Sequence, residues 1–96
     1  MNSLQEIRSK LSEQLPTLKK KYPIATLAIF GSYSRGTQNE NSDIDIMVEF
    51  NGSMGWNYFD LYDDLQTLFK NKVDLVSRGG IQNHYWEYLK DKMIYV

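Results

Sequence analysis

The sequence predicts a small α+β domain (mixed α/β) in which helices pack against one small mixed sheet. Three observations support this class: helical periodicity at the start of the chain, short apolar runs typical of strands, and an alternation of strand and helix signals up to the end. With 96 residues, of which 42% are apolar or aromatic, the chain can build one modest core. We therefore expect residues 1–96 to form a single domain.

The first predicted element is an amphipathic helix that follows residue 3. Apolar residues at spacings of three and four mark its buried face: Leu4, Ile7, Leu11, Leu15 and Leu18. Ser3 with Glu6 three residues later is a capping-box pattern. Pro16 is expected to kink this helix or to begin a second short one, and Pro23 to stop it.

Two predicted strands enclose a loop rich in Gly, Ser and Asn. Residues 24–30 (IATLAIF) form a continuous apolar run, which is typical of a strand buried on both faces. Residues 31–42 (GSYSRGTQNENS) predict a turn, a short helix and a loop. Residues 43–50 (DIDIMVEF) alternate, so the two isoleucines and the valine share one face and both aspartates share the other.

The second half of the chain continues the alternation. Residues 58–69 fit an amphipathic helix and residues 73–76 (VDLV) a short strand. Residues 78–80 predict a turn, residues 81–89 a third helix, and residues 94–96 a last strand-like segment. The chain therefore supplies at least three helices and three strands.

The formal net charge of −1 conceals an uneven distribution along the chain. Residues 1–42 carry a net charge of +3, residues 43–76 carry −5, and the last twenty residues carry +1. A near-neutral total excludes a broad basic surface for nucleic-acid backbones, so no direct nucleic-acid partner is expected. For Asp60, Asp63 and Asp64 we expect solvated helix faces.

Composition also restricts the cellular setting. The chain has no cysteine, which excludes disulfides and thiolate metal sites and fits the cytoplasm. It has neither an apolar run of signal-peptide length near its start nor 18 consecutive apolar residues anywhere. We expect a cytoplasmic protein with no membrane partner.

Two aspartates separated by one residue carry the strongest chemical signal. On a strand, Asp43 and Asp45 point to the same face, and at roughly 6 Å their charges repel by about 3 kcal/mol at an effective dielectric constant near 20. In bulk water the cost is well under ~1 kcal/mol, so an exposed strand could simply tolerate the pair. A divalent cation would instead turn the repulsion into binding, because Mg²⁺ is held by one or two carboxylates with waters and phosphates. Asp74, in VDLV, could add a third carboxylate from a neighbouring strand.

A strand that leads directly into Gly31 and Ser32 favours a phosphate-binding turn. Backbone N–H groups converge there, the glycine permits close approach, and the Ser32 hydroxyl can donate to a phosphate oxygen. The alternative is a plain turn in which Ser32 caps the helix. Arg35 could pair with phosphate or hold the acidic loop, Ser42 could cap or orient that loop, and Gly36 is expected as a helix C-cap.

A phosphate cradle beside paired carboxylates predicts metal-assisted phosphoryl or nucleotidyl transfer. The carboxylates would hold metal ions that bridge nucleotide phosphates, and a third carboxylate could deprotonate the attacking hydroxyl. The chain has neither GxxxxGK[ST] nor GxGxxG, which excludes a P-loop NTPase and a dinucleotide fingerprint.

The segment GSYSRGTQNENSDIDIMVEF resembles the signature of the MNT-type minimal nucleotidyltransferases of the DNA polymerase β superfamily. The family pattern is Gly-Ser, ten residues and Asp-x-Asp, which Gly31-Ser32 and Asp43-Ile44-Asp45 match in full. Arg35-Gly36 and Ser42-Asp43 match as well, whereas Ser34 stands where the family often has Ala. KVDLV, at residues 72–76, is similar to the strand that supplies the family's third carboxylate.

The resemblance implies a polymerase-β-like nucleotidyltransferase fold that binds ATP and Mg²⁺, with two metal ions. It assigns metal-binding and catalytic roles to Asp43, Asp45 and Asp74, and nucleotide contacts to Gly31, Ser32, Arg35 and Ser42. It further implies transfer of AMP onto a hydroxyl, a tyrosine in characterised cases, of a partner HEPN-domain ribonuclease toxin, which the antitoxin thereby silences.

Two other functions remain open at this stage. One is a catalytically idle antitoxin that inhibits its toxin by binding alone, and the other is a small-molecule nucleotidyltransferase similar to aminoglycoside-modifying relatives. The retention of all three carboxylates and Ser32 gives no reason to expect idleness. The length of 96 residues leaves little room for a small-molecule pocket.

Aromatic residues are numerous for so small a core, and some are expected at an interface with a partner or a second subunit. The candidates are Trp56, Tyr58, Tyr62, Tyr85, Trp86 and Tyr88. Half-buried core or rim positions are the alternative for each of them. Arg78 and His84 are similar in spacing to a HEPN ribonuclease motif, but that module is all-helical, so we expect a surface histidine.

Overall fold

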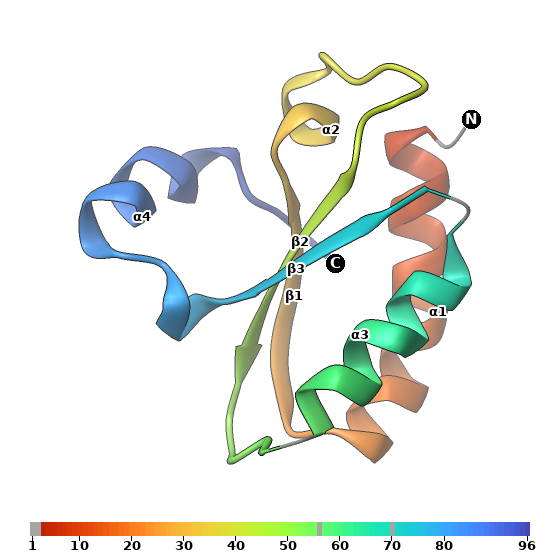
Figure 1. Ribbon diagram of the computed structural model, residues 1–96, viewed down its shortest axis with the longest axis vertical. Coiled ribbons are helices and arrows are strands. Elements are labelled where there is room, and N and C mark those ends of the chain that lie inside the picture. Colours follow the sequence, from red (N-terminus) through yellow and green to blue (C-terminus); the bar gives the residue numbers. More distant parts are fainter. Residues whose placement is uncertain (1–2, 56, 70) are drawn as a thin grey trace.

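The computed structural model describes residues 3–55, 57–69 and 71–96 and contains a four-stranded sheet (Figure 1). The strands are β1 (Ile24–Phe30), β2 (Ile44–Phe50), β3 (Val73–Ser77) and β4 (Ile94–Tyr95). Their spatial order is β3-β2-β1-β4, with β2 and β3 parallel and both other pairs antiparallel. The predicted mixed sheet and α+β class are confirmed.

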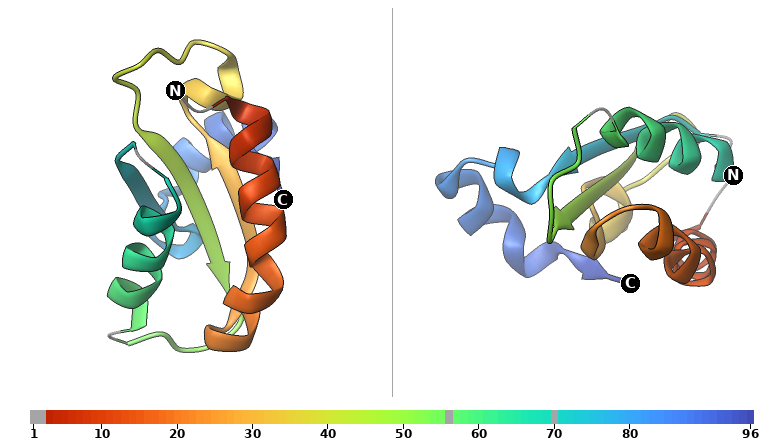
Figure 2. Two further views of the ribbon diagram at one scale, coloured as in Figure 1. Left: turned by 90° about the vertical axis from the view of Figure 1, so that its right-hand side faces the viewer. Right: turned by 90° about the horizontal axis from the view of Figure 1, so that it is seen from below.

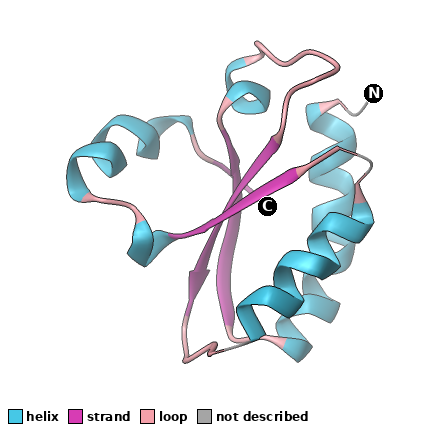
Figure 3. Cartoon of the chain, in the orientation of Figure 1, coloured by secondary structure: helices cyan, strands magenta, loops and turns pink. Residues whose placement is uncertain are grey.

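The helices lie on both faces of this sheet. They are α1 (Leu4–Lys21), α2 (Ser32–Arg35), α3 (Asn57–Leu68) and α4 (Asn83–Leu89), with 3₁₀ turns η1 (Arg78–Gly80) and η2 (Lys90–Lys92). Helices α1 and α3 pack side by side on one face, and α4 lies on the other, while α2 sits at the end of β1 (Figures 1, 2 and 3). None of the helices in the described part of the chain is long and apolar enough to cross a membrane.

Helix α1 begins as its capping box predicts. The Ser3 hydroxyl accepts from the Glu6 N–H at 3.1 Å and donates to the Glu6 carboxylate at 3.3 Å. Pro16 lies inside the helix, which continues to Lys21, so no second helix starts there. The orange end of α1 turns away from the axis of its red part (Figure 2), as expected when a proline removes one helical hydrogen bond.

The main core fills the space between the sheet and the α1–α3 layer. Its fully buried side chains come from both helices and from the inner face of β2, including Ile7, Leu11, Ile44, Ile46 and Leu61. The alternation predicted for β2 is therefore confirmed, although the strand begins at Ile44 and Asp43 lies directly before it.

A smaller cluster covers part of the opposite face, beneath α4. Ala28, Met47 and Met93 are buried there, and half-buried side chains from β1, β3, α4 and the residue Ile81 before α4 pack around them. Burial of β1 on both faces, as predicted, holds from Leu27 to Ile29, whereas Ala25 and Thr26 are half-exposed. The α4 face is thus only partly closed.

Asp64 ties α3 to the end of α1. Its Oδ2 accepts a hydrogen bond from Lys21 Nζ at 2.7 Å and one from the Tyr22 hydroxyl at 2.6 Å. Asp60 and Asp63 are exposed as predicted, whereas Asp64 is partly exposed and has bonding partners that the prediction of a solvated helix face did not include. Sequence periodicity could not show this, because the partners lie more than forty residues earlier in the chain.

Candidate active site

Two of the three predicted carboxylates lie opposite each other on neighbouring strands. Asp45 of β2 is the register partner of Asp74 of β3, and Asp43 comes directly before β2. Asp45 alternates with Ile44 and Ile46, which are buried against the α1–α3 layer. The Asp45 carboxylate therefore projects from the face that α4 only partly covers.

Burial and like charge act together on Asp45. The pKa of Asp45 is raised to about 6, first by burial of the side chain and then by the negative charges of Asp74 and Asp43. Arg35 acts in the opposite direction, which places its positive charge near the same carboxylate. The structure thus brings Asp43, Asp45, Asp74 and Arg35 into one electrostatic unit.

The donor set suits a hard divalent cation. No three His, Cys, Asp or Glu side chains among residues 3–55, 57–69 and 71–96 converge closely enough to hold a metal ion unaided. Mg²⁺ does not need such a cage, because it retains waters and takes further ligands from substrate phosphates. Mutually repelling carboxylates on an open face fit a Mg²⁺ site that substrate phosphates would complete.

Gly31 stands directly against this carboxylate site. Its backbone has φ 73° and ψ −145°, a conformation that is essentially restricted to glycine. A Cβ atom built at Gly31 would overlap the Asp45 carboxylate at Oδ2. Glycine was expected here for close approach to phosphate, and the structure shows that it also makes room for Asp45.

Helix α2 begins immediately after Gly31, so Gly31, and not Ser32, occupies the N-cap position. The alternative in which Ser32 caps the helix is therefore wrong. The Ser34 hydroxyl donates to the Gly31 carbonyl at 3.0 Å, and the Arg35 N–H donates to the same oxygen at 3.2 Å. The helix ends at Gly36 in the left-handed conformation, φ 72°, which confirms the predicted C-cap.

The loop between α2 and β2 is held by hydrogen bonds at Ser42. Its hydroxyl accepts from the Asn39 N–H at 2.9 Å, and its own N–H donates to the Asn39 carbonyl at 3.1 Å. The Asn71 amide donates to the Ser42 carbonyl at 3.3 Å and to the Tyr33 hydroxyl at 3.2 Å. Ser42 therefore caps the carboxylate loop, as one of the two sequence-based interpretations proposed. Nothing in the sequence pattern indicated Asn71 or Tyr33.

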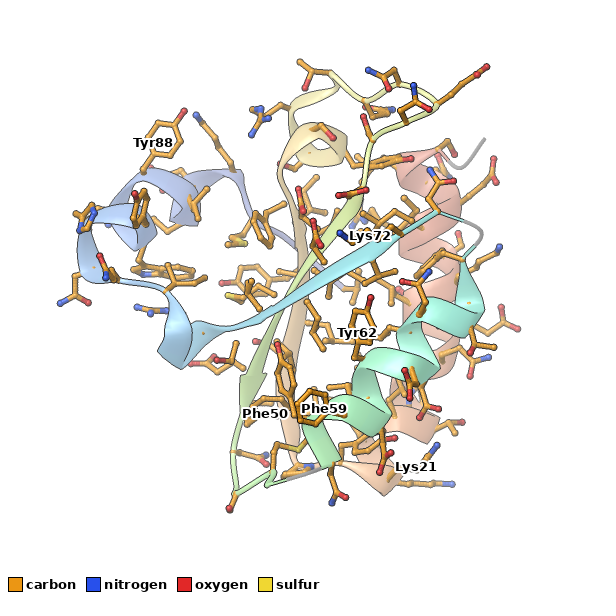
Figure 4. All side chains as sticks on the ribbon, in the orientation of Figure 1. Lys21, Phe50, Phe59, Tyr62, Lys72 and Tyr88 are labelled. Atoms are coloured by element: carbon orange, nitrogen blue, oxygen red, sulfur yellow. The ribbon has the colours of Figure 1, made fainter. Side chains whose placement is uncertain are left out.

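Lys72 is a further charged residue at the site that the sequence reasoning did not single out. Its Nζ lies 3.7 Å from Asp74 Oδ1, and both side chains are exposed (Figure 4). The available signal was its position two residues before Asp74, a spacing that places side chains on the same side of an extended chain.

A cavity of about 330 Å³ opens on the same face, between the sheet and α4. Apolar side chains form most of its lining, including Phe30 of β1, Val76 of β3 and Ile81 before α4. Gln82 and Tyr85 supply the polar groups of the lining. The site therefore joins a charged region and an apolar hollow on one sheet face.

The aromatic residues divide into structural and exposed ones. Tyr58 is half-buried, and its hydroxyl donates to the Leu75 carbonyl at 2.7 Å. Trp86 is half-buried, with the Arg78 guanidinium 3.9 Å from its ring centre. Tyr85 and Tyr88 are 58% and 63% exposed, and they remain candidates for contact with a partner.

The other predictions for this group have mixed outcomes. Tyr62 is half-buried and His84 is exposed, as predicted for a surface histidine. Trp56 lies outside the described residues. Tyr88, labelled in Figure 4, carries Lys92 Nζ 4.2 Å from its ring centre, so cations flank the aromatic groups of the α4 region.

Comparison with known families shows which family the chain belongs to. Residues 11–96 match the family model described as a nucleotidyltransferase domain. The chain belongs to the nucleotidyltransferase domain family. The resemblance to minimal nucleotidyltransferases and the predicted fold are thus confirmed, and the chain is an enzyme of that class.

Relatives of similar length are similar to this chain in sequence over their whole length. A candidate protein adenylyltransferase of Methanocaldococcus jannaschii is 43% identical over 98 residues and covers 100% of both chains. The protein adenylyltransferase MntA of Thermococcus cleftensis is 30% identical over 97 residues, covering 100% of this chain and 98% of that one.

Solved structures support the same fold. A candidate minimal nucleotidyltransferase superposes with a TM-score of 0.81 at 28% identity, covering 97% of this chain and 95% of the other. A toxin–antitoxin structure with AMP-PNP superposes with a TM-score of 0.60 at 28% identity, covering 88% of this chain and 64% of that chain.

Proposed function

We propose that this nucleotidyltransferase transfers AMP from ATP onto a hydroxyl, a tyrosine, of a partner HEPN-domain ribonuclease toxin, and that it acts as the toxin's antitoxin in the cytoplasm. The observation that carries this proposal is the placement of Asp45 and Asp74 side by side, with Gly31 against the Asp45 carboxylate. A site that binds a nucleoside triphosphate needs two parts: a carboxylate pair for the metal ion, and a glycine-containing turn before a helix for the phosphates.

The reaction follows from this arrangement. The acceptor hydroxyl oxygen forms a bond to the α-phosphorus of ATP, and the bond from that phosphorus to the bridging oxygen breaks. Pyrophosphate leaves, and the hydroxyl proton passes to a carboxylate, for which Asp74 is the proposed acceptor. Asp43, Asp45 and Asp74 would hold two Mg²⁺ ions, which supply charge neutralisation of the phosphates when bound.

The remaining residues position the nucleotide. Gly31 allows the phosphates to approach the backbone, and the Ser32 hydroxyl donates to a phosphate oxygen. Arg35, whose charge already acts on Asp45, pairs with phosphate from the last turn of α2. Ser42 contributes by holding the carboxylate loop, and its hydroxyl proton is available for donation.

The partner assignment is supported by relatives. The Thermococcus cleftensis relative is named a protein adenylyltransferase, and the structure with AMP-PNP is a toxin–antitoxin complex. The exposed Tyr85 and Tyr88 beside the site are available for contact with such a partner, or with a second copy of this chain.

Intact-mass analysis of the partner tests the proposal directly. The reading frame next to this one should encode a helical protein carrying Arg-x₄₋₆-His. After incubation with ATP, Mg²⁺ and this enzyme, that protein should gain the mass of one or more AMP groups at a tyrosine. Inhibition of the toxin without any mass gain would support an idle antitoxin. AMP transfer only to aminoglycosides would support a small-molecule enzyme.

A further inference from the structure

We propose that the cavity between β3 and α4 is the acceptor subsite, and that it receives the aromatic ring that carries the attacking hydroxyl. The inference rests on the proposed function and deepens it, because it names the residues that select the acceptor. The site carboxylates and the cavity lie on one face of the sheet. In-line transfer requires the phosphates, the carboxylates and the acceptor to follow one another along that face.

Strand register places the cavity next to the carboxylates. Val76 follows Asp74 by two residues on β3, so both side chains project from the same face. Phe30, which also lines the cavity, is the register partner of Asp45 on β1. Two residues of strand span about 7 Å, so the cavity begins one side chain away from the reacting centre.

The in-line geometry of phosphoryl transfer favours the acceptor, and not pyrophosphate, as the group that occupies the cavity. In phosphoryl transfer the attacking and leaving oxygens lie roughly in line on opposite sides of the phosphorus. The leaving pyrophosphate belongs at Gly31 and Ser32, where α2 begins. The cavity runs from Phe30, which is level with Asp45, to Val76 and α4, and Val76 follows Asp74 along β3 away from the start of α2. The acceptor oxygen therefore arrives from the cavity.

The chemistry of the lining selects an aromatic acceptor. Among the described residues, no charged side chain lines the cavity, and only Gln82 and Tyr85 bring polar groups. A sugar or an aminoglycoside would bury many hydroxyl or ammonium groups there without partners, which is costly. A phenol ring buries apolar area and leaves a single hydroxyl to reach the carboxylates. A volume of about 330 Å³ is sufficient for one such ring.

Two matched pairs of variants test the lining. Val76→Phe fills the cavity, whereas Leu75→Phe places the same ring on the opposite face of β3, where Leu75 packs against the main core. Tyr85→Ala removes a lining group, whereas Tyr88→Ala removes an equally exposed tyrosine of α4 outside the lining. Tyr85→Ala changes an exposed residue, so its result does not depend on repacking of the core.

The experiment measures binding of a small probe through the methyl NMR signals of Ile81 and Leu89. N-acetyl-tyrosinamide should shift both residues saturably with a Kd on the order of millimolar, and N-acetyl-alaninamide should not. Val76→Phe and Tyr85→Ala should each weaken tyrosinamide binding by about tenfold, with less than twofold change in Leu75→Phe and Tyr88→Ala.

Two outcomes would overturn the inference. One is the absence of saturable shifts with tyrosinamide, and the other is a stronger response of the same methyl groups to adenosine, which would assign the cavity to the nucleobase. Failure of the proposed function is a separate result, because it appears as absence of AMP transfer by the unaltered enzyme whatever the probe does.

Discussion

The Asp45 carboxylate occupies the space that a side chain at Gly31 would need. Strand β2 and the residue before α2 are therefore in such close contact that a single added carbon atom at Gly31 would displace Asp45. Because Gly31 also holds a backbone conformation with φ 73°, two independent reasons require glycine at this position. The turn that would hold phosphate and the carboxylate that would hold metal are thus parts of one packed unit.

Replacement of Gly31 by alanine should abolish AMP transfer. The added Cβ displaces Asp45, so we expect kcat to fall by at least ~10²-fold, as for misplacement of a reacting group by about 1 Å. Gly36→Ala is the matched control, since Gly36 also has positive φ (72°) but an added Cβ would meet no atom. The positive φ alone should cost each variant about 1–3 kcal/mol of stability, and Gly31→Ala should lose more because its Cβ also displaces Asp45. Equal activity losses in the two would contradict the account.

Removal of a single carboxylate charge should stop the reaction while the fold is retained. Asp43→Asn and Asp45→Asn should each lower kcat by about 10³-fold, since metal ligation supplies several kcal/mol. Asp60→Asn, at an exposed position of α3, serves as the control and should remain active. Thermal unfolding should show that Asp45→Asn is at least as stable as the original, because a repelling charge is gone.

Asp64 should stabilise the fold in a pH-dependent way. The hydrogen bond from Lys21, then that from Tyr22, holds the pKa of Asp64 below its ordinary value of 3.8. A folded-state pKa below the unfolded one means that the stabilisation is fully present above pH 3.8 and is lost as the pH falls through the lower folded value.

Asp64→Asn should therefore destabilise the protein by about 1 kcal/mol at pH 7, with a deficit that shrinks below pH ~4. Urea unfolding at a series of pH values measures this difference in the free energy of unfolding. The control is Asp63→Asn, at the exposed position directly before Asp64 in the chain. A deficit that grows on acidification would be incompatible with this interpretation.

Lys72 should compete with the metal ion for Asp74. Since its Nζ lies 3.7 Å from the carboxylate at an exposed position, the pair contributes at most about 1 kcal/mol. Lys72→Met should thus lower the Mg²⁺ concentration for half-maximal transfer by about two- to fivefold. Lys19→Met, at an exposed position of α1, is the control. A higher Mg²⁺ requirement in Lys72→Met would instead show that Lys72 serves the nucleotide.

The parts of the fold that local pattern determines could be predicted from the sequence. Periodicity placed the buried face of α1, alternation placed the two faces of β2, and Gly31 with Gly36 marked the two ends of α2. Each of these signals depends on neighbours within a few residues. The spacing of Gly31-Ser32 and Asp43-Ile44-Asp45 made the site recognisable for the same reason.

Contacts between distant segments could not be predicted. The pairing of Asp64 with Tyr22, the link from Asn71 to Ser42 and the collision that excludes a side chain at Gly31 all depend on how elements pack. Pro16 allowed either a kink or a second short helix, and the choice depends on packing: buried leucines on both sides of it accompany one continuous α1. The cavity beneath α4 likewise exists only once β1, β3 and α4 are assembled.

The central claim is that the carboxylates of β2 and β3 direct transfer of AMP, and label transfer from ATP tests it most directly. The partner toxin is incubated with this enzyme and Mg²⁺, with ATP labelled at the α-phosphorus in one sample and at the γ-phosphorus in another. The account predicts that the toxin gains the α-label alone, and that Asp45→Asn transfers none. Incorporation of the γ-label, or undiminished α-label transfer by Asp45→Asn, would contradict it.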